Sequence, residues 1–243
     1  MDVTAPARAE PHGCSLTGQV LIFDADDTLW ENNVLFERAV DDFVRWLDHP
    51  TLDGAEIRAV LNSIQAANVA AHGYGGKMFL RSLKKCLERL RERPASAAEL
   101  RHVAGLAAAV LEGRVEPVPG VVETLTVLGG RHELHLLTKG DTEEQQRKLD
   151  LSGLAHHFRG IHIVAEKDVG TYRRLTRDLD LAPAATWMIG NSPKSDILPA
   201  RQAGMNAVFI PNDNTWVLEH SDLDDDDEGV LRLRAFSELQ HHF

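Results

Sequence analysis

The chain has 243 residues, of which 43% are apolar and 26% are charged, and its formal net charge at pH 7 is -11. This composition is typical of a soluble globular protein of one or two domains, and the negative charge argues against the broad basic surface that binds nucleic acid. No apolar stretch approaches the roughly 20 residues of a membrane-spanning helix, and residues 1–17 lack the apolar core of a secretory signal, so we expect a cytoplasmic protein with no membrane or nucleic acid partner.

In chain order, residues 1–17 mix Ala, Pro, Gly and charge without periodicity, and we expect a mobile tail there. Apolar runs of strand length then occur in QVLIFD, ELHLLT, GIHIVA, TWMIG and NAVFI, and helical spacing is found over residues 120–128, 142–149, 169–179 and 195–202. Strands that alternate with helices predict an α/β protein with a doubly wound parallel sheet. The segment GVLRLRAFSEL is expected to add an edge strand and a last short helix.

One region interrupts this alternation. Residues 33–114 show helical spacing throughout, broken by the glycine-rich segment HGYGGKM, and the segment VEPVPG marks the return to the alternating pattern. We therefore assign residues 18–32 and 115–243 to the α/β core and residues 33–114 to an inserted helical domain. The two cysteines, Cys14 and Cys86, have no neighbouring ligand at metal-site spacing and are expected to be free thiols.

Polar residues follow the apolar runs. In a parallel sheet, ligands bind outside the carboxyl ends of the strands, so residues just after each run are expected to lie close together. They combine acids, a hydroxyl and lysines, which suits phosphate and a hard divalent cation. These residues are Asp24, Asp26, Thr138, Lys139, Lys167 and the segment GNSPKSD, which ends at Asp196.

The four segments DADDT, LLTKG, AEKD and GNSPKSD, in this order, resemble the four motifs of the haloacid dehalogenase superfamily of hydrolases. The resemblance covers the chain except for its tail, and it implies a Rossmann-like α/β core. The inserted helical domain resembles the smaller cap type of the family, which covers the active site.

This resemblance implies that Asp24 is a nucleophile that attacks phosphorus and forms an aspartyl-phosphate, which water then hydrolyses. Asp26 would be the general acid and base, and a spacing of two puts both carboxylates on one side of an extended segment. Thr138 would bond a phosphoryl oxygen, and Lys167 would neutralise negative charge and orient Asp24. Asp27, the third acid, is expected to point away or to cap local backbone.

The resemblance also implies a Mg²⁺ ion, held by the carboxylates of Asp24 and Asp196 and by the main-chain carbonyl of Asp26. The cation would offset the repulsion between the acids and an anionic substrate. The family more usually has an aspartate where this chain has Asn191. An amide oxygen can still reach the metal or its water, so we expect Asn191 to weaken the magnesium site without disabling it.

Substrate choice is expected to lie in the cap, because the core motifs handle only the phosphoryl group. The glycine-rich loop between two cap helices carries Tyr74 and Lys77, which are expected to meet the substrate, whereas the alternative is a plain turn between helices. Lys139 and Lys194 also lie close to motif residues and are alternative lysines for contact with the substrate. The substrate is expected to be a small phosphorylated metabolite, and the oligomeric state is not predicted.

The function that we expect is thus a magnesium-dependent phosphatase that hydrolyses a small phosphate monoester. A phosphosugar mutase of the same fold, a catalytically weak binding protein and a phospho-receiver signalling module remain alternatives. Dehalogenases of this superfamily need neither a metal nor the second acid, so Asp26 favours phosphoryl transfer over dehalogenation.

Overall fold

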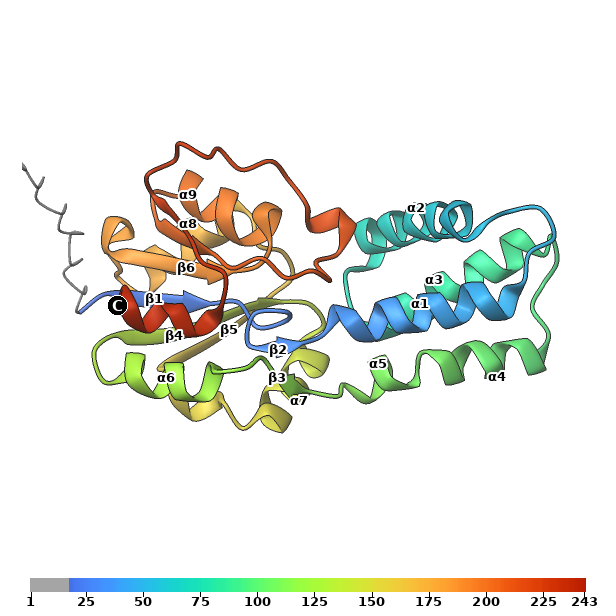
Figure 1. Cartoon of the computed structure of the whole chain (residues 1–243), viewed down its shortest axis with the longest axis horizontal. Coiled ribbons are helices and arrows are strands. Elements are labelled where there is room, and N and C mark those ends of the chain that lie inside the picture. Colours follow the sequence, from blue (N-terminus) through green and yellow to red (C-terminus); the bar gives the residue numbers. More distant parts are fainter. Residues whose placement is uncertain (1–17) are drawn as a thin grey trace, which may run out of the picture.

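The computed structural model describes residues 18–243, so the expected tail at residues 1–17, including Cys14, lies outside the described residues. Six parallel strands form one sheet in the spatial order β5-β4-β1-β6-β7-β8 (Figure 1). From β1 the chain builds outward to β4 and β5 on one side and to β6, β7 and β8 on the other, which is the predicted doubly wound topology. The strands are β1 (Val20–Phe23), β4 (Glu133–Lys139), β5 (Gly160–Val164), β6 (Thr186–Gly190), β7 (Asn206–Phe209) and β8 (Val230–Arg232).

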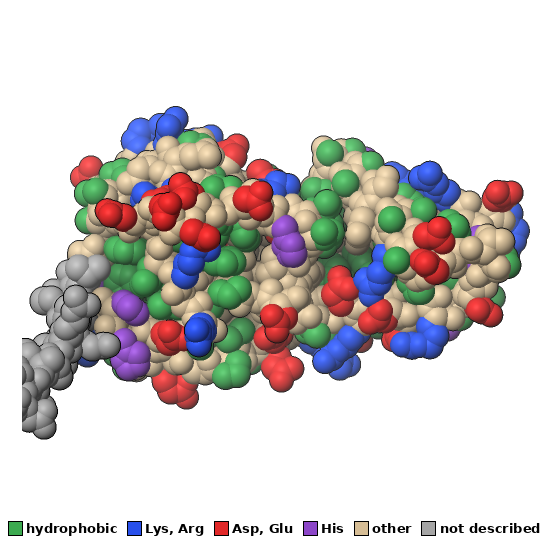
Figure 2. All heavy atoms as spheres, turned by 45° about the horizontal axis from the view of Figure 1, so that its top comes forward, with side chains coloured by type: hydrophobic (Ala, Val, Ile, Leu, Met, Phe, Trp, Pro, Cys, Tyr) green, Lys and Arg blue, Asp and Glu red, His purple; other side chains and the backbone are tan. Residues whose placement is uncertain are grey.

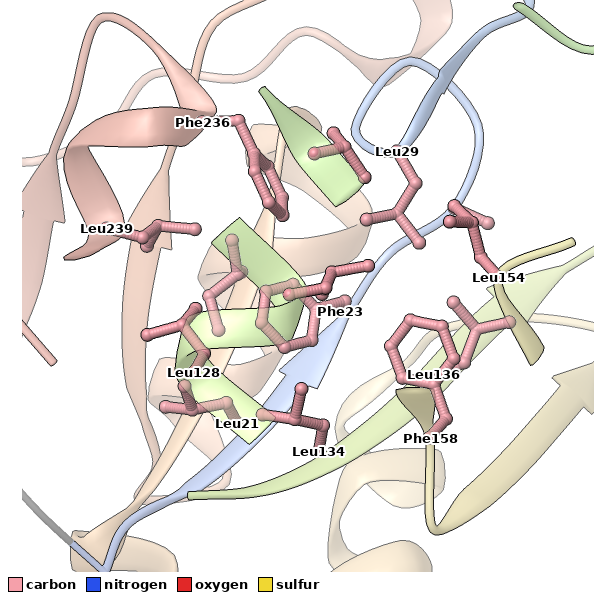
Figure 3. Packing of buried hydrophobic residues seen from close by; sticks show 14 of the residues in the cluster. Leu21, Phe23, Leu29, Leu128, Leu134, Leu136, Leu154, Phe158, Phe236 and Leu239 are labelled. Carbon is pink, nitrogen blue, oxygen red and sulfur yellow. The ribbon is translucent and has the colours of Figure 1, made fainter. Parts of the chain in front are cut away.

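Different helices cover the two faces of the sheet, because neighbouring residues of a strand point to opposite faces. Leu21 and Phe23 of β1 pack with α6 (Val121–Gly129), α7 (Thr142–Ser152) and the C-terminal 3-10 turn η5 (Phe236–His241) in one apolar cluster (Figure 3). Ile22 lies on the opposite face, in a cluster with residues of α8 (Val169–Asp178) and α9 (Leu198–Gln202). Burial on both faces explains the continuous apolar run of β1.

The helix expected over residues 195–202 is shorter than predicted, because a wider π-type turn at Pro193–Ile197 precedes α9. Pro199 has no backbone N–H, so it cannot donate to the carbonyl of Ser195 as a regular helix would require. The hydroxyl of Tyr172 donates to that carbonyl instead, at 2.8 Å. The sequence pattern did not reveal this contact, since Tyr172 lies on a different helix.

Five helices form the described chain between β2 (Trp30–Glu31) and β3 (Glu116–Pro117), inside the range expected for the cap. They are α1 (Asn33–Leu47), α2 (Gly54–His72), α3 (Gly76–Leu90), α4 (Ala97–Leu106) and α5 (Ala108–Glu112). The cap stands beyond one end of the sheet, and β2 and β3 pair antiparallel where the chain enters and leaves it (Figure 1). Residues 73–75 of the glycine-rich segment separate α2 from α3 as expected, whereas His72 ends α2 and Lys77 and Met78 already belong to α3.

The cap has an apolar core of its own, separate from both clusters of the α/β part. Phe43, Leu61, Leu83 and the buried free Cys86 belong to it. Figure 2 shows acidic and basic side chains interspersed over the visible surface of both parts. Within residues 18–243, no helix is long and apolar enough to cross a membrane.

Candidate active site

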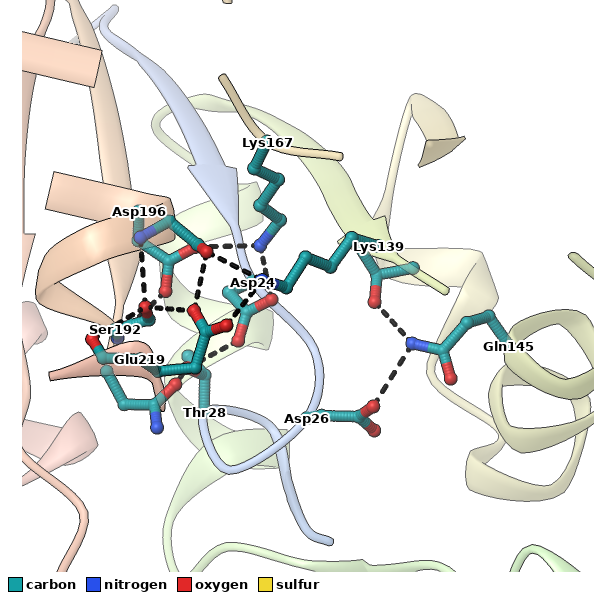
Figure 4. A network of polar contacts seen from close by, with 12 residues as sticks. Asp24, Asp26, Thr28, Lys139, Gln145, Lys167, Ser192, Asp196 and Glu219 are labelled. Atoms are coloured by element: carbon teal, nitrogen blue, oxygen red, sulfur yellow. Dashed lines mark hydrogen bonds and ion pairs between the residues drawn. The ribbon is translucent and has the colours of Figure 1, made fainter. Parts of the chain in front are cut away.

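The four motifs converge where the carboxyl ends of the strands face the cap. A cavity of ≈ 180 Å³ lies between the two parts, and its walls include Asp24, Asp26, Thr138, Lys139, Lys167, Asn191 and Asp196 from the core, and Tyr74 from the cap. All these side chains were expected to lie together from the sequence. Figure 4 shows the core residues of this site that form its polar network.

Asp24, Lys167 and Asp196 form a buried charged cluster. They are 7%, 3% and 1% exposed, and the Lys167 Nζ donates to Asp24 Oδ1 and, at 2.7 Å, to Asp196 Oδ1. Burial, helped by the charge of Asp196, raises the pKa of Asp24 to about 7 although Lys167 opposes the shift. Burial alone would lower the pKa of Lys167, but the two carboxylates outweigh it and raise that pKa. The cluster therefore carries one net negative charge when all three groups are ionised.

Asp196 is fixed by the turn that follows β6. Its Oδ2 accepts a hydrogen bond from Ser192 N at 3.0 Å, and the Ser192 hydroxyl accepts from Ser195 N at 3.0 Å and so caps the turn. Gly190 leaves room for this arrangement, because a Cβ at that position would lie 2.2 Å from Asp196 Oδ2. The glycine and the serine of the motif GNSPKSD thus position its final aspartate.

Asp26 is held on the side of the site toward α7. Its carboxylate accepts from Lys148 Nζ at 3.0 and 3.1 Å, from Trp30 Nε1 at 2.7 Å and from Gln145 Nε2 at 3.2 Å. Gln145 also donates to the Thr138 hydroxyl, so it connects the expected acid–base residue with the expected phosphate ligand. Sequence reasoning missed both Gln145 and Lys148. Their spacing of three on a helix that follows the second motif was the available signal.

Asn191 and Asp27 have defined hydrogen-bond partners. The Asn191 amide nitrogen donates to Thr215 Oγ1 at 2.9 Å, which leaves its Oδ1 facing Thr28, whose hydroxyl lies 3.3 Å away. The same hydroxyl is 3.1 Å from Asp24 Oδ2, so the Asn191 oxygen faces the acidic cluster. Asp27 Oδ1 accepts from two backbone N–H groups at the start of α1, at 2.8 and 2.9 Å, which confirms that it caps local backbone.

Of the cap residues and lysines that were expected to contact the substrate, Tyr74 and Lys139 line the cavity and Lys77 and Lys194 do not. Lys139 Nζ lies 2.6 Å from Glu219 Oε1 and 3.3 Å from the Tyr74 hydroxyl, which in turn donates to Glu166 at 2.8 Å. Burial would lower the pKa of Lys139, but Glu219 and Tyr74 outweigh it and raise that pKa. Lys77, by contrast, is exposed and does not line the cavity.

Lys194 is exposed as well and donates to the carbonyl of Leu218 at 3.0 Å. Glu219, which sequence reasoning missed, is buried and also accepts from the hydroxyls of Ser192 and Ser195. It lies in a 3-10 turn (Val217–Glu219) far from the motifs in sequence, so no spacing could indicate its position. The structure thus brings Lys139 and Tyr74 to the site and leaves Lys77 and Lys194 outside it.

The donor set has the chemistry of a site for a hard cation. Two carboxylates, Asp24 and Asp196, meet the amide oxygen of Asn191, and their net negative charge is one that a cation would offset. Residues 18–243 contain no group of three or more His, Cys, Asp or Glu side chains placed to hold a metal. A cation here would therefore need water, substrate or main-chain oxygens to complete its ligands, as Mg²⁺ commonly does.

Comparisons with known proteins agree with this geometry. The chain is 37% identical over 82 residues to the phosphoserine phosphatase of Thermus thermophilus, an alignment that covers 32% of this chain and 33% of that enzyme. It is 28% identical over 109 residues to the glyceraldehyde 3-phosphate phosphatase of Methanothermobacter thermautotrophicus, covering 42% of this chain and 47% of that enzyme. The chain thus aligns with only a third to a half of the length of these curated relatives.

The similarity to a solved structure extends over nearly the whole chain. A haloacid dehalogenase-like family hydrolase from Xanthomonas campestris superposes with a TM-score of 0.78 and 27% identity, covering 92% of this chain and 93% of that one. Haloacid dehalogenases are among further solved structures with this fold, at 20% identity or less, which shows the fold alone. The family model of the haloacid dehalogenase-like hydrolases matches residues 19–204, well over half of the sequence. The chain therefore belongs to the haloacid dehalogenase-like hydrolase family.

Proposed function

We propose that this hydrolase is a magnesium-dependent phosphatase that cleaves a small phosphate monoester through an aspartyl-phosphate at Asp24. The observation that carries the proposal is the position of Asp24. Its carboxylate is buried at the end of β1, lines the cavity and is bonded to Lys167. A second acid, Asp26, lines the same cavity.

The chemistry follows from these positions. An Asp24 oxygen attacks phosphorus as the bond between phosphorus and the ester oxygen breaks, and Asp26 gives a proton to the departing alcohol. Asp26 then takes a proton from the water that attacks phosphorus, which releases phosphate and restores Asp24. The dehalogenase reaction needs no such second acid, so Asp26 supports a phosphatase.

Thr138 and Lys167 contribute to binding of the phosphoryl group. Thr138 lines the cavity and is oriented by Gln145, so its hydroxyl can donate to a phosphoryl oxygen. Lys167 is the buried cation bonded to Asp24, and it offsets charge that develops during transfer. Both roles are electrostatic and depend on fixed positions.

Mg²⁺ would be held by Asp24, Asp196, the main-chain carbonyl of Asp26 and the oxygen of Asn191. When bound, the cation supplies positive charge that reduces repulsion between the acids and the phosphate dianion. Asn191→Asp should lower the magnesium concentration needed for half-maximal rate, because it adds a charge to the ligand set. An unchanged or higher requirement would argue that Asn191 bonds only its neighbours.

The two curated relatives support a phosphatase, since both are named for hydrolysing small phosphate esters. We infer a small phosphorylated metabolite as the substrate. A mutase would use the same two acids, and it is distinguished by its product, a rearranged sugar phosphate rather than free phosphate.

The test is phosphate release from 4-nitrophenyl phosphate with magnesium and with a chelator. We expect activity that needs the metal, no turnover for Asp24→Asn, and a loss of about 10² to 10⁴ in rate for Asp26→Asn. The matched control is Asp178→Asn, which changes an exposed acid paired with Arg177. Ordinary turnover by Asp24→Asn would refute the proposed mechanism.

A further inference from the structure

The cap wall of the cavity is polar along one helix. Arg58, Asn62 and Gln65 of α2 all line the cavity, and their spacing of four and three residues places them in one polar stripe on that helix, which ends at the apolar Val69. A cap helix that served only to close the site would turn apolar residues inward. The polar stripe instead offers groups that can contact the alcohol part of a substrate.

The two amides of this stripe are open for such contacts. Asn62 and Gln65 line the cavity, and no hydrogen bond joins either side chain to another group within residues 18–243. Asn68, on the same helix, differs because it donates to Ser82 at 2.8 Å and accepts from Lys85 at 2.6 Å. An amide carries donors and an acceptor, which matches the hydroxyl group of an alcohol.

The basic residues of the cavity, unlike these amides, are already paired. Arg58 donates to Glu37 at 2.7 Å and to Asp41 at 2.5 Å, so this cap cation faces two carboxylates. Lys139 pairs with Glu219, Lys148 with Asp26, and Lys167 with Asp24 and Asp196.

The acids outnumber the cations in the described lining of the cavity. The acids are Asp24, Asp26, Asp27, Glu37, Asp141, Glu144, Asp196 and Glu219, whereas the cations are Arg58, Lys139, Lys148 and Lys167. At the cap end the lining holds Glu37 and Arg58, and Asp41 beside Arg58 adds a second acid, so a second anionic group on the substrate would meet one net negative charge there. Like charges at short range in a partly buried site repel strongly.

We propose that the cavity takes the monophosphate of an uncharged polyhydroxy alcohol and discriminates against an ester whose alcohol part carries a carboxylate. Asn62 and Gln65 bond the hydroxyls, and Glu37 with Asp41 prevents Arg58 from receiving a carboxylate. This inference rests on the proposed phosphatase function.

Two substrates of nearly equal size test it. sn-Glycerol 3-phosphate and 3-phosphoglycerate differ mainly in a hydroxymethyl group replaced by a carboxylate, and 4-nitrophenyl phosphate reports phosphatase chemistry without either. We expect kcat/KM to be at least about tenfold higher for glycerol phosphate. Equal or higher efficiency for phosphoglycerate, with 4-nitrophenyl phosphate hydrolysed, overturns the substrate class alone. Failure to hydrolyse any of the three overturns the phosphatase proposal itself.

Substitutions in the cap test which residues cause the substrate preference. Gln65→Leu should lower the efficiency with glycerol phosphate, relative to 4-nitrophenyl phosphate, by about fivefold, as expected for one lost hydrogen bond. Glu37→Gln should raise the relative efficiency with phosphoglycerate, because it removes one of the two negative charges paired with Arg58. The control is Asp42→Asn on the same helix as Glu37, since Asp42 pairs with the exposed Arg45 and does not line the cavity. Substrate ratios that do not move in either cavity variant overturn the assignment.

Discussion

Gly190 shows how closely single residues of the site are fitted together. The backbone at the end of β6 passes so near Asp196 that a Cβ would lie 2.2 Å from its Oδ2 and 2.5 Å from its Cγ. The motif glycine is thus required by a close approach to the side chain of a proposed metal ligand. Its backbone needs no unusual φ, because Gly190 is not among the residues with positive φ.

Gly190→Ala should therefore displace Asp196. We expect a fall in phosphatase rate of about 10²-fold, as a misplacement near 1 Å can cause, and a stability loss of about 1–3 kcal/mol from overpacking. Phosphate release and thermal unfolding measure the two effects. Gly105→Ala is the control, since no atom lies within 4 Å of the position that its added methyl group would take in α4. Normal activity in Gly190→Ala would contradict the proposed role of Asp196.

Lys148 is the residue that fixes Asp26. It is 4% exposed, and besides both oxygens of Asp26 it bonds Asn32 Oδ1 at 2.8 Å, immediately before α1. Lys148→Met should slow hydrolysis of an alkyl ester about tenfold more than that of 4-nitrophenyl phosphate, because nitrophenolate leaves without a proton. Lys148→Arg keeps the cation and should restore most of the difference.

Two measurements are needed to interpret this variant. Steady-state rates with both esters give the leaving-group dependence, and thermal unfolding reports whether the buried substitution has disturbed the fold. Equal losses with the two esters in a folded Lys148→Met protein would show that Lys148 does not act through Asp26.

At the scale of elements, α7 connects the core site with the cap. Gln145 and Lys148 reach Asp26, and Glu144 Oε2 accepts from Gly76 N at 2.8 Å, at the start of cap helix α3. Tyr74, two residues before Gly76, docks on Glu166 and Lys139 and packs edge-on against Trp216. The glycine-rich loop is thus held against the core by contacts of Tyr74 and Gly76, whereas Lys77 is exposed.

Tyr74→Phe tests this docking, because it removes the hydroxyl contacts and keeps the ring. With a lost hydrogen bond worth about 1 kcal/mol, backbone amides in residues 73–76 should exchange with solvent about fivefold faster. Hydrogen exchange followed by mass spectrometry measures this, and β1 serves as an internal reference that should not change. Unaltered exchange in the loop would mean that its remaining contacts, those of the ring to Trp216 and Lys139 and of Gly76 N to Glu144, hold it without the hydroxyl.

For the whole molecule, the sequence was sufficient to predict the doubly wound sheet and the residues that gather at its edge. Parallel strands that are buried on both faces have apolar sequences, and their carboxyl ends lie along the same edge of the sheet. Asp24, Thr138 and Lys167 could therefore be placed close together from the sequence alone. Each of these residues lies at or just beyond the end of its strand, which limits where its side chain can lie.

The site residues that the sequence could not predict are those whose position depends on how separate helices and turns pack against one another. Glu219 reaches the site from a late turn, and Lys148 reaches it from α7, a helix whose buried residues are two polar side chains and Leu149. Lys77 lies in the first turn of α3, three residues after Tyr74, and only tertiary packing decides that Tyr74 faces the cavity and Lys77 faces solvent. In the π-type turn before α9, the carbonyl of Ser195 likewise accepts its hydrogen bond from Tyr172 of another helix.

The central claim, that Asp24 carries the phosphoryl group, is tested most directly by trapping the covalent enzyme. The protein is mixed with magnesium and phosphate-radiolabelled 4-nitrophenyl phosphate, quenched with acid within one turnover, and digested for peptide mapping. We predict label on the peptide that contains Asp24, removed by hydroxylamine and absent in Asp24→Asn. Label on a different residue, or steady turnover with no labelled enzyme at any quench time, would contradict the account.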